Sequence, residues 1–184
     1  MLNTTYKDLR DIMPASWMPS YEELKGIVPL SWPFVEHGLV RGFMAASVAV
    51  CFCLDEVARK GTSDKRDVAL LSAEDDDAVL RSVADMVSDD ERRSGDVQRQ
   101  WMHVLLWQCC SHEHDADELL AWVEIIYAEF DYPIELAPFV RYMPAKGKGK
   151  LPKDLVQALK TYLVKWKNDR LVEGEYGVVK TEAW

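Results

Sequence analysis

Histidines and acids, the residue types that bind zinc, follow one another at His112-Glu113-His114-Asp115. A zinc site on a helix uses histidines four residues apart, and it needs three or four ligands that converge on the ion. Here the histidines are two apart, and the nearest other one, His103, falls in an apolar stretch. We therefore interpret the segment as a polar link in which Asp115 caps the next helix, and we predict no metal site.

The four cysteines form two close pairs, Cys51-x-Cys53 and Cys109-Cys110. On a helix, residues two apart point to nearly opposite faces and adjacent residues diverge by about 100°. Neither pair can therefore chelate one ion or close a disulfide without unwinding its helix. A chain of this length also builds a core that needs no disulfide. We predict that all four are reduced thiols in the core.

Cys109 and His112 are three residues apart, so a thiol and an imidazole could meet at a helix end. A nucleophilic cysteine needs a lowered thiol pKa, whereas the acidic surroundings here raise it. The sequence also contains neither a Gly-rich phosphate loop nor a nucleophile elbow. We predict no catalytic residue and no cofactor. An enzyme of unrecognised type, using carboxylates or this pair in an interhelical cleft, stays open as an alternative.

The layout of charge is more informative about function. The 184 residues include 31 acidic and 22 basic side chains, a net charge of -9. Residues 74–135 hold 17 acidic and 4 basic side chains, whereas residues 141–170 hold 9 basic and 2 acidic ones. Binding of nucleic acid needs clustered lysines and arginines, so this balance excludes a broad nucleic-acid interface.

Two explanations account for the acidic run. The carboxylates could form a solvated helix face beside a basic C-terminal face. Alternatively, they form a docking surface for a basic protein, because complementary charge speeds encounter and sets specificity. The residues predicted to bind such a partner are Glu74, Asp75, Asp76, Asp77, Asp85, Asp89, Asp90 and Glu91.

The elements that must position these residues are helices, because no stretch alternates with a period of two over any length. Capping patterns predict helix starts at Ser20, Ser31 and Asp115. The stretch 97–110 is apolar nearly all round, which indicates a central helix with Trp101 and Trp107 buried. Further helices are predicted over residues 43–59, 63–72 (with Val68, Leu70 and Leu71 inward), 76–87, 115–130 and from Pro152 onward.

These helices predict an all-α fold, either a compact bundle or a short solenoid-like stack of antiparallel helix pairs. We expect a single domain over residues 1–184, with its core at about 20–168 and with 1–19 and 171–184 peripheral. The apolar run 43–54 is too short to cross a bilayer, which takes about 20 residues, so it indicates a buried core helix. The start of the chain does not resemble a secretory signal, so we expect a cytoplasmic protein without membrane contact.

Two stretches resemble the signatures of a small all-helical bacterial family of unknown function. The first is Leu30-Ser31-Trp32 followed by Gly38-Leu39-Val40-Arg41-Gly42, and the second is EIIYAEFDYP at 124–133 followed by FVRYMP at 139–144. Within the second, we expect Arg141 to pair with Asp131. Some members of that family look like immunity proteins encoded beside polymorphic or contact-dependent toxins. The resemblance supplies no catalytic residue.

Charge and resemblance together predict an immunity-type protein, which binds and neutralises a cognate protein toxin through its acidic surface. The expected partner is a basic nuclease-like toxin domain. A helical adaptor module without a toxin, or the enzyme described above, is the alternative. The sequence does not predict an oligomeric state.

We predict that the fold needs neither metal nor disulfide. Thermal unfolding curves recorded with and without a chelator, and with and without a reductant, should coincide. A large drop of the melting temperature in chelator would overturn the interpretation of residues 112–115 as a polar link.

Overall fold

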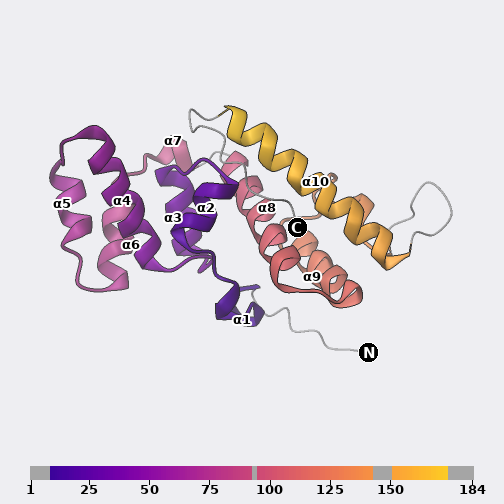
Figure 1. The fold of residues 1–184 in the computed structure, drawn as a ribbon. Helices are drawn as coiled ribbons and strands as arrows, with labels where there is room; N and C mark the ends of the chain where they lie inside the picture. The colour runs from indigo at the N-terminus through magenta and orange to yellow at the C-terminus, as the bar shows by residue number, and fades with distance from the viewer. Residues whose placement is uncertain (1–8, 93–94, 143–150, 174–184) are drawn as a thin grey trace.

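The computed structural model describes residues 9–92, 95–142 and 151–173, and within them every regular element is a helix (Figure 1). The predicted all-α class is therefore confirmed. No helix among these residues is long and apolar enough to cross a membrane. In chain order the elements, with η for a 3-10 helix, are α1 (Leu9–Ile12), η1 (Ala15–Trp17), α2 (Tyr21–Ile27), α3 (Trp32–Val40), α4 (Ala46–Lys60), α5 (Lys65–Leu71), α6 (Asp76–Ala84), α7 (Asp89–Arg92), α8 (Gly95–His112), α9 (Ala116–Glu129), η2 (Ala137–Phe139) and α10 (Pro152–Glu173).

Helix α3 joins two groups of helices. On one side α8, α9 and α10 pack against one another, and on the other side α4, α5 and α6 do so (Figure 1). Helix α3 contacts both α8 and α6. The short α7 follows α6 and also contacts α3. This central position makes α3 the element that places the two groups relative to each other.

The helix ends follow the capping patterns of the sequence. The Ser20 hydroxyl accepts a hydrogen bond from the backbone of Glu23, whose side chain accepts one from the Ser20 backbone in return. Ser31 caps α3, and Gly61 ends α4 in the left-handed region at φ 71°. Asp115 caps α9 as predicted, and its own backbone N–H donates to the side-chain carboxylate of Glu113. Hydrogen bonds to these otherwise unpaired end groups stabilise each helix.

Trp101 lies at the centre of the core and is fully buried, as predicted. Its ring stacks on that of Phe34 from α3, with the ring centroids 4.3 Å apart, and its indole N–H donates to the Phe34 carbonyl at 2.8 Å. A β-carbon at Gly38 would lie 2.2 Å from Trp101 Cζ2. Glycine at this position therefore allows α3 and α8 to approach closely.

Several expectations about burial are wrong. Trp107 is only partly buried, and the Lys167 ammonium lies 4.8 Å from its ring centroid. The apolar run 43–54 is not buried throughout, because Cys51 and Leu54 face away from the helices that pack on α4. On α5, Leu70 is buried as predicted, but Val68 and Leu71 are exposed. Peripheral helices bury one face only, so apolar content overstated their burial.

Two further boundaries differ from the sequence-based expectation. Leu9 and Met13 belong to the buried core, so the core begins before residue 20. Helix α10 continues to Glu173, beyond the expected start of a loose tail at residue 171. Trp184, which we expected to be exposed or disordered, and the basic stretch 146–150, which we expected to form a flexible loop, lie outside the described residues. The expected bond between Arg141 and Asp131 is also wrong: Arg141 Nε donates to Glu124 at 2.9 Å, because the chain after α9 folds back along that helix.

A buried histidine fastens α10 to α8. His103 is fully buried, and its ring stacks on Trp166 with the centroids 4.2 Å apart. Its Nδ1 lies 2.7 Å from the Arg99 carbonyl and its Nε2 2.7 Å from the Tyr162 hydroxyl. Because a carbonyl only accepts, Nδ1 carries the proton and Nε2 accepts from Tyr162. Burial lowers the pKa of His103 to about 4, so the imidazole is neutral near pH 7.

We predict that Gly38→Ala destabilises the protein even though alanine favours a helix by about 1 kcal/mol over glycine. The added methyl group would overlap Trp101 and Met44. The matched control is Gly26→Ala on α2, where a β-carbon meets nothing within 4 Å and the helix should gain stability. Chemical unfolding compares the two. Equal effects of both substitutions would show that α3 and α8 are not in close contact.

We predict that His103 makes stability depend on pH. An unfolded histidine has a pKa near 6.5. As the pH falls from about 6.5 to 4, the unfolded chain takes up a proton here while the folded chain does not, so the free energy of unfolding decreases, by roughly 3 kcal/mol. His103→Gln should be less stable than the parent at pH 7, and the difference should shrink towards pH 4. Parallel losses in both proteins would exclude His103 as the cause.

Candidate partner-binding site

The residues predicted to bind a partner do not lie in one cluster. Glu74 to Asp77 lie at the start of α6, whereas Asp85 and the α7 residues Asp89, Asp90 and Glu91 lie at and beyond its end. Nine helical residues at about 1.5 Å each separate the two groups by roughly 13 Å. The structure therefore divides the predicted surface into a start group and an end group.

In the start group, Asp75 has a structural role. Its carboxylate accepts a hydrogen bond from the backbone N–H of Ala78 at 2.7 Å and caps α6. Asp76 and Asp77 occupy the first turn, where a negative charge is favoured by the helix dipole. All of these side chains and Glu74 are exposed. The capping bond uses Asp75 and leaves the other three carboxylates available to solvent or to a partner.

The end group is organised by Arg92, which joins three helices. Its Nε donates to both carboxylate oxygens of Glu36 on α3, at 2.8 and 3.0 Å. The other guanidinium nitrogens donate to Asp89, at 2.8 Å, and to the carbonyl of Ala84 at the end of α6, at 2.5 Å. Asp89 is thus part of this network. Glu36 is 9% exposed, so Arg92 neutralises a carboxylate that the fold buries.

The remaining end-group carboxylates face solvent. Glu91 accepts hydrogen bonds from the Ser88 hydroxyl and backbone, which lower the pKa of the Glu91 carboxyl and keep it ionised. Asp85 and Asp90 are exposed, and neither side chain forms a hydrogen bond or ion pair within the described part of the chain. These three side chains therefore present negative charge to a partner.

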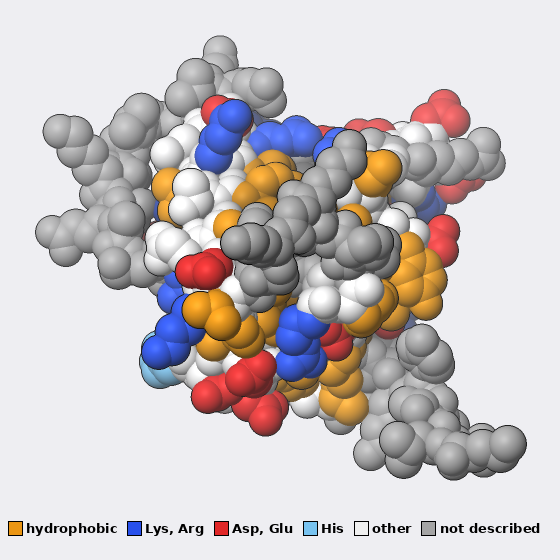
Figure 2. All heavy atoms as spheres, turned by 90° about the vertical axis from the view of Figure 1, so that its right-hand side faces the viewer, with side chains coloured by type: hydrophobic (Ala, Val, Ile, Leu, Met, Phe, Trp, Pro, Cys, Tyr) orange, Lys and Arg blue, Asp and Glu red, His pale blue; other side chains and the backbone are white. Residues whose placement is uncertain are grey.

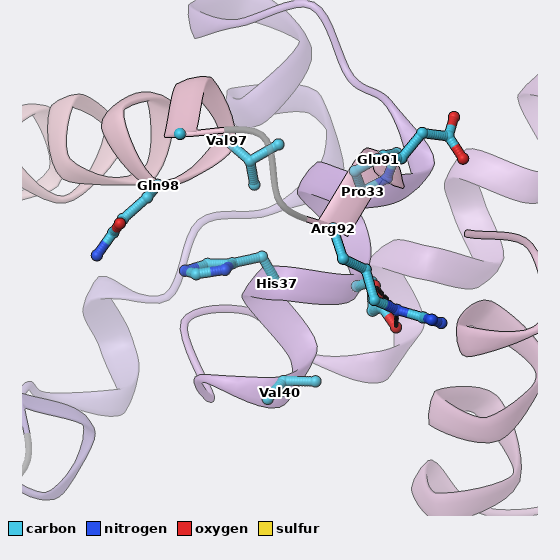
Figure 3. Close-up of a pocket in the computed structure, with 9 residues that line it drawn as sticks. Pro33, His37, Val40, Glu91, Arg92, Val97 and Gln98 are labelled. Atoms are coloured by element: carbon cyan, nitrogen blue, oxygen red, sulfur yellow. Dashed lines mark hydrogen bonds and ion pairs between the residues drawn. The ribbon is translucent and has the colours of Figure 1, made fainter. Parts of the chain in front are cut away.

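A groove of about 320 Å³ lies beside the end group, between α3 on one side and α7 and the start of α8 on the other (Figure 3). It extends from Pro33 to Val40, which is 56% exposed at the end of α3. Arg92 crosses from α7 towards α3, whereas Glu91 points outward. Its lining consists of Pro33, Glu36, His37, Val40, Glu91, Arg92, Gly95, Val97 and Gln98. Burial and, to a smaller extent, Arg41 lower the pKa of His37.

Several carboxylates elsewhere in the acidic run are paired with arginines. Asp96 binds Arg170 at 2.7 Å, and Glu135 binds Arg99 at 2.7 Å. Arg41 binds Glu129. The face that lies to the right in Figure 1 shows acidic, basic and hydrophobic side chains intermixed (Figure 2). The solvated-face explanation, with charges balanced across the surface, therefore fits this side of the molecule, whereas Asp85 and Asp90, next to and on α7, form no ion pair with another described residue.

The cysteines do not combine with histidine. Cys109 and Cys110 are buried, and burial raises the pKa of both thiols, that of Cys110 to about 12. His112 instead stacks on Trp17, with the ring centroids 5.8 Å apart. Burial, together with Asp67, raises the pKa of Cys53 to about 11. A protonated thiol is a poor nucleophile, so this arrangement favours structural cysteines. Within the described ranges, no three histidine, cysteine, aspartate or glutamate side chains are grouped as metal ligands.

We predict that Arg92→Met lowers the melting temperature markedly, because it leaves the buried Glu36 carboxylate without its cation. The matched control is Arg81→Met on the exposed face of α6, which should change the melting temperature little. Adding Glu36→Gln to Arg92→Met should restore part of the loss. If Arg92→Met melts like the control, the network does not hold α7 on α3.

Comparison with known proteins identifies the family of this chain but no individual relative. No curated protein and no solved structure matches this chain. A family model described as an uncharacterized protein conserved in bacteria, DUF2247, matches residues 21–167. The match covers all of the helices from α2 to α9 and most of α10, including α3, α6 and α7, which form the candidate site. The chain belongs to this bacterial family, DUF2247.

Proposed function

We propose that this chain is an immunity-type binding protein, which neutralises a cognate bacterial protein toxin by docking through the carboxylates of α6 and α7. The observation that carries the proposal is the concentration of exposed carboxylates at and between α6 and α7. Asp96, Glu129 and Glu135 are paired with arginines, whereas Asp85 and Asp90 are exposed without a partner among the described residues.

Unpaired acids of one sign repel one another and add little to the stability of the free protein. They do raise the rate at which a basic partner is captured, and they reject acidic competitors. The acidic balance of the chain supports a basic protein as the partner and disfavours nucleic acid. A basic toxin domain that acts on nucleic acid has a surface of the complementary sign.

The chemistry of the described residues supports binding over catalysis. The thiols of Cys53, Cys109 and Cys110 have raised pKa values and are buried. In the groove, Arg92 is committed to Glu36, Asp89 and a backbone carbonyl. These groups bond to one another, so few of their hydrogen-bonding atoms are left to contact a reacting substrate. The enzyme alternative depends on the remaining groove residues, His37 and Gln98.

We predict that reversing Asp77, Asp85 and Asp90 to lysine slows association with the toxin while the helical fold persists. The suitable probe is the C-terminal domain of the polypeptide encoded by the reading frame directly upstream. Asp75 is left unchanged because it caps α6. The slowing should be greatest at low salt, because salt screens exposed charges over about 10 Å at 0.1 M. Association rates across a salt series, together with circular dichroism, provide the measurement.

The matched control reverses Glu118, Asp154 and Asp169, which are exposed on α9 and α10 and change the net charge equally. This control should associate nearly as fast as the parent. If the two triple variants slow association to the same extent, only net charge matters and no acidic docking site exists. If the parent neither binds this domain nor protects cells that express it, the immunity role is wrong and the adaptor or enzyme alternative gains support.

A further inference from the structure

The start group and the end group of carboxylates differ in what surrounds them. The end group adjoins the groove through Glu91, whereas the start group lies at the other end of α6 and none of its residues lines the groove. Protein interfaces combine a central pocket that excludes water with a charged rim, and the pocket supplies most of the affinity. Of the two groups, only the end group lies beside a groove, so only there do a pocket and a charged rim occur together.

We propose that the groove between α3 and the start of α8 receives a lysine or arginine side chain from the basic partner. This inference rests on the proposed function and assigns its anchor point. The apolar members of the lining, Pro33, Val40 and Val97, can cover the aliphatic stem of such a side chain. Glu91, the end-group carboxylate that lines the groove, then lies at its rim to meet the charged head.

The balance of charge around the groove favours a cation as the occupant. The lining contains two carboxylates, those of Glu36 and Glu91, and one guanidinium, that of Arg92. The guanidinium of Arg92 is already neutralised by Glu36 and Asp89, so it offers little attraction to an anion. Glu91 stays ionised because Ser88 donates two hydrogen bonds to it. A volume of about 320 Å³ lies at the lower end of ligand pockets, which suits one or two side chains rather than a large ligand.

Val40 is the groove residue whose substitution tests the proposal most directly. It is 56% exposed although it ends a helix whose other side packs in the core. An exposed valine is unremarkable alone, and Val68 on α5 is 55% exposed. Val40 lines this groove between α3 and α8, next to Glu36 and Arg92, whereas Val68 lines a separate hollow at the start of α5, with Asp64 and Lys65. The two valines therefore form a matched pair for an experiment.

The experiment measures the Kd of the upstream-encoded toxin domain for the parent, Val40→Arg and Val68→Arg. Val40→Arg places a cation in the groove, so we expect the Kd to rise about tenfold or more, mainly through faster dissociation. Val68→Arg adds the same charge at an equally exposed position and should leave the Kd within about twofold. A second groove variant, Gln98→Arg, should weaken binding as Val40→Arg does. Melting curves confirm that each variant is folded.

Each outcome decides between the proposals. If the parent binds and both groove variants bind as tightly as the parent, the groove is not the anchor, although the immunity role stands. If Val68→Arg weakens binding and Val40→Arg does not, the partner docks on the α5 side and the inference is wrong. If the parent does not bind at all, both the immunity role and the anchor are wrong.

Discussion

The contact of Trp101 with α3 is the constraint on which the rest of this structure depends. The indole stacks on Phe34 and donates to its carbonyl, and Gly38 lets the two helices meet at a distance that no side chain would permit. This contact fixes the rotation of α3 about its axis. Glu36, His37 and Val40 then line the groove, where Glu36 bonds Arg92 of α7. The core packing of one tryptophan thus determines where the groove lies.

Much of the fold could be predicted from the sequence because its signals are local. Capping residues such as Ser20, Ser31 and Asp115 act within one helical turn, and the all-round apolar pattern of 97–110 indicated the central helix α8. Burial of individual residues on outer helices was harder to predict. Cys51 and Val68 are apolar or weakly polar, yet they face solvent because the neighbouring helices cover only one side of α4 and α5.

The candidate site could be predicted only in part, because its organisation depends on contacts between distant residues. The acidic residues of α6 and α7 were evident from composition, but their division into two groups follows from where α6 begins and ends. The Glu36–Arg92 pair joins residues 56 positions apart in the chain, and no local pattern predicts it. A weak signal exists: Glu36 is the single carboxylate in the otherwise apolar stretch of α3, and a buried charge requires a partner.

Hydrogen–deuterium exchange tests the central claim most directly, because it locates the contact surface without any substitution. The experiment compares this chain alone with the chain mixed with the proposed partner, for which the probe is the C-terminal domain of the polypeptide encoded by the reading frame directly upstream. Docking at the groove predicts slower exchange in the second half of α3 and in residues 85–92, where the groove and the end group meet. It also predicts little change in the outer face of α10. Protection confined to α9 and α10, with unchanged exchange in α3 and α7, would contradict it.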